Sequence, residues 1–221
     1  MGSEGPSVVV VHVTGFKKFH GVSENPTETI VRNLKGFMQK KELPEGLILG
    51  SCNVLETAGE GALPQLLEFF QHAVSEKVNE SLNGKQTILL HLGVNSGAMG
   101  FAIENQAVNE ATFCCQDEKG WKPQVNRVPV VSSDGSISTV RETSLPVNEI
   151  VKALSNMGYD VMPSYDAGRF VCNFVYYHSL RFAEQNRMKS LFVHVPLFLS
   201  IDEETQMEFV ASLLKVLASL N

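Results

Sequence analysis

Apolar positions along the chain fall into short continuous runs that predict buried strands. These runs are rich in Val, Ile and Leu, and several are bounded by Gly or Pro, as is typical of strands covered on both faces. The run "SVVVVHVTGF", for example, is β-branched almost throughout and reaches Gly15. The predicted strands cover residues 7–16, 46–56, 86–94, 159–164 and 190–197.

Between these runs the apolar residues recur at helical spacing, which predicts amphipathic helices. Gly158 follows the third helix at a position that favours a C-cap, and acidic residues occupy the first turn of the last helix. From about 101 to 145 the periodicity fades, so we predict irregular structure there with room for a hairpin. The predicted helices cover residues 27–42, 62–77, 147–157, a segment that begins near 170, and 202–220.

The alternation of strands and helices predicts the fold class. It favours an α/β, three-layer single domain with a central twisted, mostly parallel sheet and helices on both faces. We find no repeat or linker, so one catalytic domain is expected over residues 1–221, with residues 1–6 flexible.

Composition and charge indicate which binding partners and which cellular compartment to expect. The apolar fraction of 43% and charged fraction of 19% are ordinary for a globular protein. A net charge of −6 gives no reason to expect nucleic acid or an anionic membrane as a partner. The first ten residues lack the features of a secretory signal, so we expect a cytoplasmic protein whose four cysteines are reduced thiols.

Candidate chemistry gathers in the segments that follow the predicted strands. Ligands of open α/β sheets bind beyond the carboxyl ends of strands, and these segments offer Glu104, Asp166, Cys172 and His194. A thiol, an imidazole and a carboxylate are the parts of a cysteine nucleophile, its base and the group that orients the base. Cys172 lies in the first turn of a predicted helix, where the helix dipole favours the thiolate.

Each of these residues also has an ordinary structural interpretation. Cys172 could be a small apolar core residue. His194 could be a hydrogen-bonded structural histidine, since His91 has nearly the same sequence context. Glu104 could be a surface acid, and Asp166 competes for the same role because it is closer in sequence to Cys172. Periodicity alone does not choose between the two acids.

Four stretches in a fixed order add a resemblance to a known family. They are "VTGFKKFHGVSENPT", "GFAIENQAVN", "DAGRFVCNFVYYHSL" and "SLFVHVPL". Over nearly its whole length the chain resembles the pyroglutamyl-peptidase I (pyrrolidone-carboxylate peptidase) family, and it is especially similar to plant members. The resemblance implies a single α/β domain and a thiol omega-peptidase, which removes an N-terminal 5-oxoproline from peptides through an acyl-thioester.

The resemblance also assigns roles to residues. It implies that Cys172 is the nucleophile, His194 its acid and base, and Glu104, rather than Asp166, the residue that orients the histidine. It implies neither a metal nor an organic cofactor, and it leaves the oligomeric state open, a homo-oligomer included. Binding of the pyroglutamyl ring is implied for Phe16, Phe19, Phe170 and Val171.

Two departures from the family keep other functions open. Relatives often have a proline between the two aromatic residues near the start, where this chain has Lys17 and Lys18, and bacterial relatives carry a glutamine where it has Val94. The first alternative is therefore a catalytically silent binder of N-terminally blocked peptides. A second is a nucleoside phosphorylase-like enzyme of similar fold. The sequence assigns no role to the adjacent Cys114 and Cys115.

Overall fold

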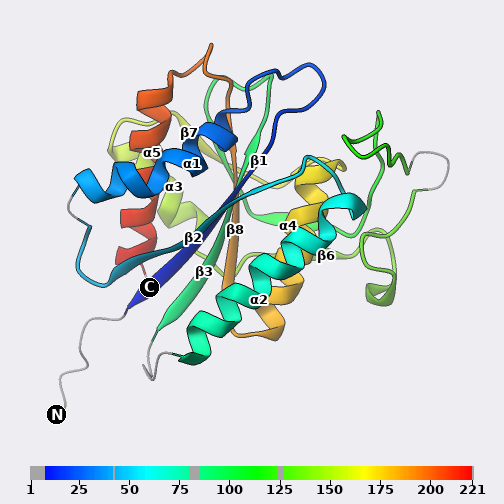
Figure 1. The fold of residues 1–221 in the computed structure, drawn as a ribbon, viewed down its shortest axis with the longest axis horizontal. Coiled ribbons are helices and arrows are strands. Elements are labelled where there is room, and N and C mark those ends of the chain that lie inside the picture. Colours follow the sequence, from blue (N-terminus) through cyan, green and yellow to red (C-terminus); the bar gives the residue numbers. More distant parts are fainter. Residues whose placement is uncertain (1–7, 42, 80–84, 124–126, 221) are drawn as a thin grey trace.

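A six-stranded mixed sheet forms the centre of the structure, a computed structural model that describes residues 8–41, 43–79, 85–123 and 127–220 (Figure 1). The expectation for residues 1–6 falls outside the described residues. In spatial order the strands are β2 (Leu47–Leu55), β1 (Val9–Phe16), β3 (Gln86–Val94), β8 (Lys189–Val195), β4 (Phe101–Glu104) and β7 (Val161–Ser164).

The strands divide into two groups by direction. β2, β1, β3 and β8 are parallel to one another, whereas β4 pairs with β8 antiparallel and β7 runs parallel to β4. The prediction of a mostly parallel sheet is confirmed. The prediction of irregular structure was wrong at β4, which lies inside the main sheet. A separate antiparallel pair, β5 (Gln106–Val108) and β6 (Val140–Glu142), is joined by a long connection rather than a tight hairpin turn.

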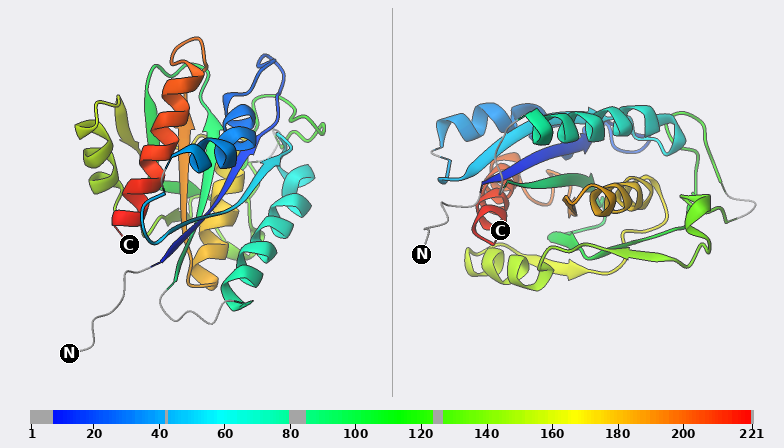
Figure 2. Two further views of the ribbon diagram at one scale, coloured as in Figure 1. Left: turned by 60° about the vertical axis from the view of Figure 1, so that its left-hand side comes forward. Right: turned by 90° about the horizontal axis from the view of Figure 1, so that it is seen from below.

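Helices cover both faces of the sheet, which confirms the three-layer fold (Figure 2). One core cluster lies under α1 (Pro26–Lys40), α3 (Val147–Asn156) and α5 (Glu203–Ser219). The other lies under α2 (Leu63–Asn79) and α4 (Val171–Gln185). Each predicted helix is present with ends within about two residues of the expected ones, and Gly158 after α3 has the positive φ of +94° expected of a C-cap glycine.

The alternation of side chains along each strand sorts polar groups onto one face. In β8, Leu191, Val193 and Val195 join the cluster under α1, α3 and α5, so Phe192 and His194 point to the α2 and α4 side. In β1, His12 and Thr14 alternate with valines that join the cluster under α1, α3 and α5. His12 and Thr14 therefore point to the opposite face, under α2 and α4. The buried polar groups of these strands therefore lie on the face covered by α2 and α4, and the first turn of α4 carries Cys172.

None of the helices in the described parts of the chain is long and apolar enough to cross a membrane.

Candidate active site

His194 lies near the end of β8 and is 8% exposed. Its ring packs against Phe192, with 4.9 Å between the ring centroids. The other histidine with a similar sequence context, His91, is wholly buried, and its two ring nitrogens are bonded to the Thr14 and Ser179 hydroxyls at 2.7 Å each. Burial lowers the pKa of His91 to about 3, so His91 is a neutral structural residue.

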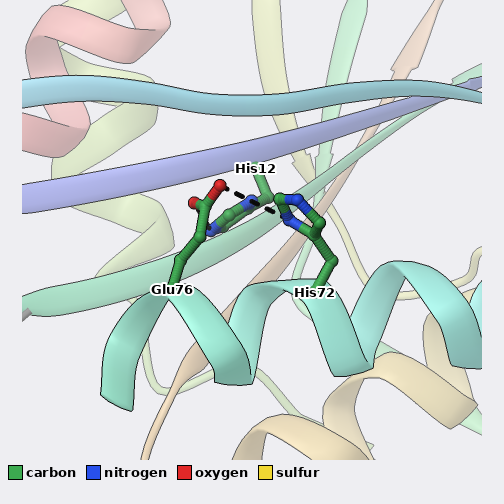
Figure 3. Close-up of side chains that lie close together, drawn as sticks. All are labelled: His12, His72 and Glu76. Carbon is green, nitrogen blue, oxygen red and sulfur yellow. Dashed lines mark ion pairs between the residues drawn. The ribbon is translucent and has the colours of Figure 1, made fainter. Parts of the chain in front are cut away.

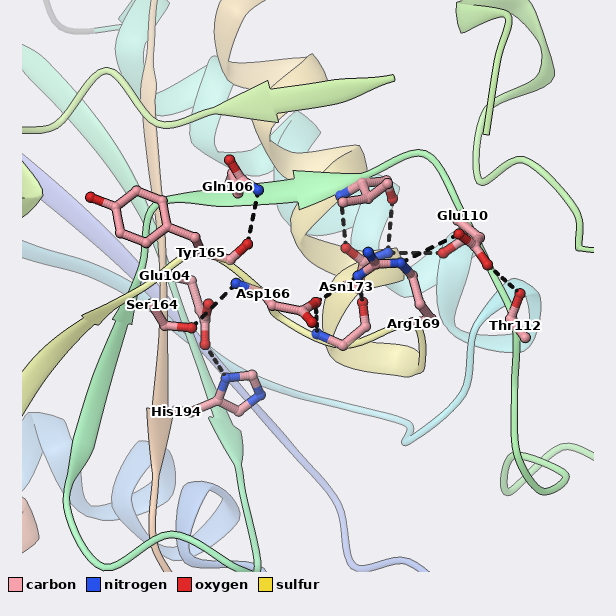
Figure 4. Close-up of polar contacts among 12 residues, drawn as sticks. Glu104, Gln106, Glu110, Thr112, Ser164, Tyr165, Asp166, Arg169, Asn173 and His194 are labelled. Carbon is pink, nitrogen blue, oxygen red and sulfur yellow. Dashed lines mark hydrogen bonds and ion pairs between the residues drawn. The ribbon is translucent and has the colours of Figure 1, made fainter. Parts of the chain in front are cut away.

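A buried carboxylate contacts the His194 ring. Oε1 of Glu104 lies 2.7 Å from Nδ1 of His194, and Glu104 is 2% exposed (Figure 4). The antiparallel register explains the contact, because Ala102 lies directly opposite His194 and Glu104 is the diagonal neighbour on the same face. Oε2 of Glu104 is buried without a hydrogen-bond partner among the described residues, so the imidazole is the main partner of this carboxylate.

Helix α4 holds the strand that carries Glu104. The Tyr176 hydroxyl donates to the Glu104 carbonyl over 2.9 Å, and Tyr176 is wholly buried. Tyr176 lies one turn after Cys172 on α4, so the same helix fixes the thiol and the carboxylate strand relative to each other.

Cys172, half-buried, meets the end of β3 at Gly93. A Cβ atom built at Gly93 would lie 3.0 Å from the Cys172 Sγ and 2.5 Å from a ring carbon of Phe192. Gly93 is also the residue of β3 that pairs with His194. Only a glycine therefore leaves room for the thiol to reach the end of β8 beside the imidazole.

The charges around His194 favour its protonated form. Burial opposes protonation, but the charge of the Cys172 thiolate and a hydrogen bond to it, together with the hydrogen bond and charge of Glu104, raise the pKa of His194 to about 10. The protonated form of His194, between Cys172 and Glu104, is thus favoured near neutral pH.

Asn173, which sequence reasoning missed, anchors the turn that carries Cys172. Its side-chain oxygen accepts from the Val108 N–H over 2.8 Å. Its amide donates to the carbonyls of Val108 and Glu110 over 2.8 and 2.9 Å (Figure 4). Asn173 is wholly buried, so it ties the start of α4 to the segment that continues from Glu104. A polar residue in an otherwise apolar helix was the signal in the sequence that could have found it.

The loop before α4 is fixed by a second set of contacts. The Thr112 N–H donates to the Arg169 carbonyl over 3.0 Å, and the Arg169 side chain lies 3.4 Å from Glu110. Arg127 also binds Glu110 through two short hydrogen bonds, and mainly for this reason the pKa of Glu110 falls to about 2. Asp166 bonds to Arg169 and to the Gly168 N–H, and its side chain is 72% exposed.

The residues expected to hold the substrate ring differ in exposure. Phe16 and Val171 are buried in the cluster under α2 and α4, at 2% and 1% exposed. Phe19 and Phe170 are half-buried. Phe170 packs against Phe113, with 4.5 Å between ring centroids.

The two departures from the family pattern have structural counterparts. The Lys17 carbonyl accepts from the Thr57 hydroxyl over 2.6 Å and from the Asn25 amide over 3.0 Å, which anchors the loop that lacks the proline. Val94 packs against the cluster under α1, α3 and α5, so its side chain points away from the face that carries Cys172. Cys114 and Cys115 are exposed.

A cysteine, a histidine and a buried carboxylate that meet near the strand ends of an α/β sheet are the arrangement of a cysteine hydrolase. Comparison with known proteins agrees with this class. The family model described as pyroglutamyl peptidase matches residues 9–213, so the chain belongs to the pyroglutamyl peptidase family, and the family predicted from the sequence is confirmed.

Relatives in sequence and structure carry the same description. A pyrrolidone-carboxylate peptidase of Pyrococcus furiosus is 30% identical over 188 residues, which cover 84% of this chain and 80% of the relative. One of Oceanobacillus iheyensis is 31% identical over 191 residues, covering 83% and 82%. The crystal structure of the Thermococcus litoralis pyrrolidone carboxyl peptidase superposes with a TM-score of 0.75 at 25% identity, covering 95% of this chain and 92% of that one.

Family, relatives and fold together indicate a pyroglutamyl peptidase of the cysteine type, the activity and enzyme class expected from the sequence. The alternative of a catalytically silent binder is not favoured.

Replacement of Asn173 tests whether this residue holds the turn that carries Cys172 in place. In Asn173→Ala the Val108 N–H and the Glu110 carbonyl lose their Asn173 partner, while the Val108 carbonyl keeps its bond from the Glu110 N–H. We expect a loss of stability of about 2–6 kcal/mol, because two unsatisfied buried groups cost about 1–3 kcal/mol each. Thermal unfolding should show a lowered Tm, and kcat should fall at least about tenfold at temperatures where the variant is folded, since Cys172 is no longer held in place.

Asn33→Ala removes an exposed asparagine on α1 and serves as the matched control. Equal Tm and kcat for the two variants would show that Asn173 anchors nothing.

Proposed function

We propose that this protein hydrolyses the bond after an N-terminal pyroglutamyl residue of peptides, with Cys172 as nucleophile, His194 as acid and base, and Glu104 as the orienting carboxylate. The observation that carries the proposal is the buried 2.7 Å contact between Glu104 and His194, beside the thiol of Cys172. Asp166 is less suited to orient the histidine, because its side chain is exposed and bonds to Arg169.

The arrangement supplies the steps of an acyl transfer. The Cys172 thiolate attacks the carbonyl carbon of the pyroglutamyl residue and forms a tetrahedral intermediate. Glu104 engages Nδ1 of His194, which leaves Nε2 to give its proton to the departing amine. The C–N bond breaks and an acyl-thioester with Cys172 remains. His194 then takes a proton from water, which attacks the thioester, releases pyroglutamate and restores the thiolate.

The start of α4 offers donors for the negative oxygen of the intermediate. Phe170 is the N-cap residue, and within the described part of the chain no side-chain cap engages the N–H groups of the first turn. These N–H groups, among them that of Cys172, have no partner inside the helix. They can therefore stabilise an oxyanion formed at the carbon that Cys172 attacks.

Selection of the blocked N-terminus follows from an apolar subsite. Phe19 and Phe170 are half-buried and offer side-chain surface to the lactam ring, whereas the buried Phe16 and Val171 shape the floor beneath it. An unblocked glutaminyl residue would bring a charged amine into this subsite, and an unpaired buried charge costs several kcal/mol. We therefore expect the enzyme to reject it.

The cellular setting is part of the proposal. All four cysteines are free thiols, and the proposed mechanism requires Cys172 to stay reduced, which favours the cytoplasm. Peptides with an N-terminal pyroglutamate are the proposed partners. The expectations of no nucleic acid and no membrane partner, and of a single domain over residues 1–221, stay predictions.

Replacement of the nucleophile tests the reaction. Cys172→Ala should lose nearly all release of a fluorescent amine from a pyroglutamyl amide, measured at neutral pH under reducing conditions, because no other group in the proposed site can form the thioester. Cys115→Ala, which removes an exposed thiol, should keep wild-type turnover, and the wild type should leave the glutaminyl amide uncut. Turnover by Cys172→Ala near the wild-type rate would rule out this nucleophile.

Replacement of the two candidate acids tests the orienting role. Glu104→Gln should lower kcat at least about tenfold, though less than loss of the thiol does, while Asp166→Asn should stay within about twofold of wild type. The Glu104 charge raises the pKa of His194, so Glu104→Gln should lower that pKa. Because His194 must be protonated to release the amine, the alkaline limb of kcat/KM should move to lower pH in Glu104→Gln only. The same shift in Asp166→Asn would mean that the orienting acid has been assigned wrongly.

A further inference from the structure

A second group of potential ligands lies between β1 and α2. His12 comes from the middle of β1, and His72 and Glu76 come from consecutive turns of α2 (Figure 3). One side-chain N or O atom of each lies within 4.8 Å of the others. Two imidazoles and one carboxylate converge on one point, although His12 is far in sequence from His72 and Glu76.

The spacing of these atoms fits a tetrahedral metal ion. Nε2 of His12 lies 3.4 Å from Oε2 of Glu76, and Nδ1 of His72 lies 3.4 Å from the other carboxylate oxygen, Oε1. Around a Zn²⁺ ion with bonds of about 2.0–2.1 Å, neighbouring tetrahedral ligands are about 3.4 Å apart. One atom of each residue already lies within 4.8 Å of the others, and the exposed side chains of His72 and Glu76 can turn to close the remaining distance.

The ring nitrogen of His12 that points into the group makes no hydrogen bond to a described residue. Nε2 of His12 is buried and makes no hydrogen bond to any described residue, although Glu76 is only 3.4 Å away. The ring is held in place from two sides. Phe69 packs edge-on at 6.2 Å between ring centroids, and a Cβ atom at Gly50 would lie only 2.7 Å from the ring. A fixed, buried imidazole nitrogen that makes only this ion-pair contact and no hydrogen bond has capacity for a ligand.

The other nitrogen of His12 has the partner that a metal-bound histidine requires. Nδ1 lies 3.0 Å from the Ser51 hydroxyl, which can accept its proton when Nε2 binds a metal. The Ser51 N–H also lies 3.2 Å from Nδ1 and donates to it in the opposite tautomer. Binding of an ion at Nε2 therefore selects the tautomer that donates to the Ser51 hydroxyl.

We propose that His12, His72 and Glu76 form a Zn²⁺ site that ties α2 to β1. Two imidazoles and a carboxylate are a ligand set that zinc uses in proteins. The side chains of His72 and Glu76 are 54% and 42% exposed, so an ion can enter from solvent and a water can take the fourth position. This ion has no part in the hydrolysis, for which the family resemblance implies no metal.

The site is separate from the catalytic thiol. His12 pairs with Leu89 of β3, whereas Gly93, beside Cys172, lies four residues further along that strand. At about 3.3 Å per residue, the two sites are about 13 Å apart along the strand direction. Thiols also bind zinc, so a test must remove Cys172 and the exposed pair Cys114 and Cys115.

Zinc titration of the full chain tests the proposal in a background that carries Cys172→Ala, Cys114→Ala and Cys115→Ala. Isothermal calorimetry should show one Zn²⁺ bound per chain, and Tm should rise with zinc. Adding His72→Ala should weaken binding at least about tenfold and remove the rise in Tm. His20→Ala, the matched loss of an exposed imidazole, should change neither.

His72 is exposed, so its removal should leave the metal-free Tm and circular dichroism unchanged, which separates loss of a ligand from loss of the fold. Co²⁺ in the same background should give the visible absorption of a tetrahedral ion, and His72→Ala should abolish it. Equal zinc affinity in the His72→Ala and His20→Ala chains, or no binding by the background chain at millimolar zinc, would overturn the proposal.

Discussion

The buried contact between the Glu104 carboxylate of β4 and the His194 imidazole of β8 is the interaction on which the proposed site depends. A carboxylate that is 2% exposed is stable as an anion only if a positive or donating group faces it. His194 supplies that group, and both Cys172 and Glu104 favour its protonated form.

The mixed direction of the sheet makes this contact possible. Four parallel strands bring the ends of β3 and β8 to one edge, where Gly93 leaves room for the thiol at the start of α4. The carboxylate comes from β4, which runs the opposite way and reaches His194 as a diagonal cross-strand neighbour. Tyr176 and Asn173 then tie α4 to the same segment. The helix α4, the strand β4 and the strand β8 together fix the positions of Cys172, Glu104 and His194.

Much of this fold could be predicted from the sequence, because the strands and helices around Val11, Leu90 and Leu34 carry clear periodicity. The strand β4 could not, since four residues are too short for a pattern and its place depends on pairing with β8 and β7. For the same reason the sequence pattern alone did not choose between Glu104 and Asp166. Family resemblance favoured Glu104, and the buried position of Glu104 supports that choice.

Other features depend on contacts between distant parts of the chain. His72 and Glu76 have the spacing of neighbours on a helix, but nothing in the sequence places His12 beside them. Likewise, the bonds of Asn173 to Val108 and Glu110 span more than sixty residues. Such groups become visible only once the strands are in register.

The protonation state of His194 tests the account most directly. Nitrogen-15 NMR of the histidine side chains in the wild type, with His194 assigned by comparison with His194→Gln, would follow both ring nitrogens as pH rises. The account predicts that both nitrogens of His194 stay protonated well above pH 7, because the neighbouring thiolate and carboxylate raise its pKa. A His194 that is already neutral below pH 7 would contradict the charged set proposed for this site.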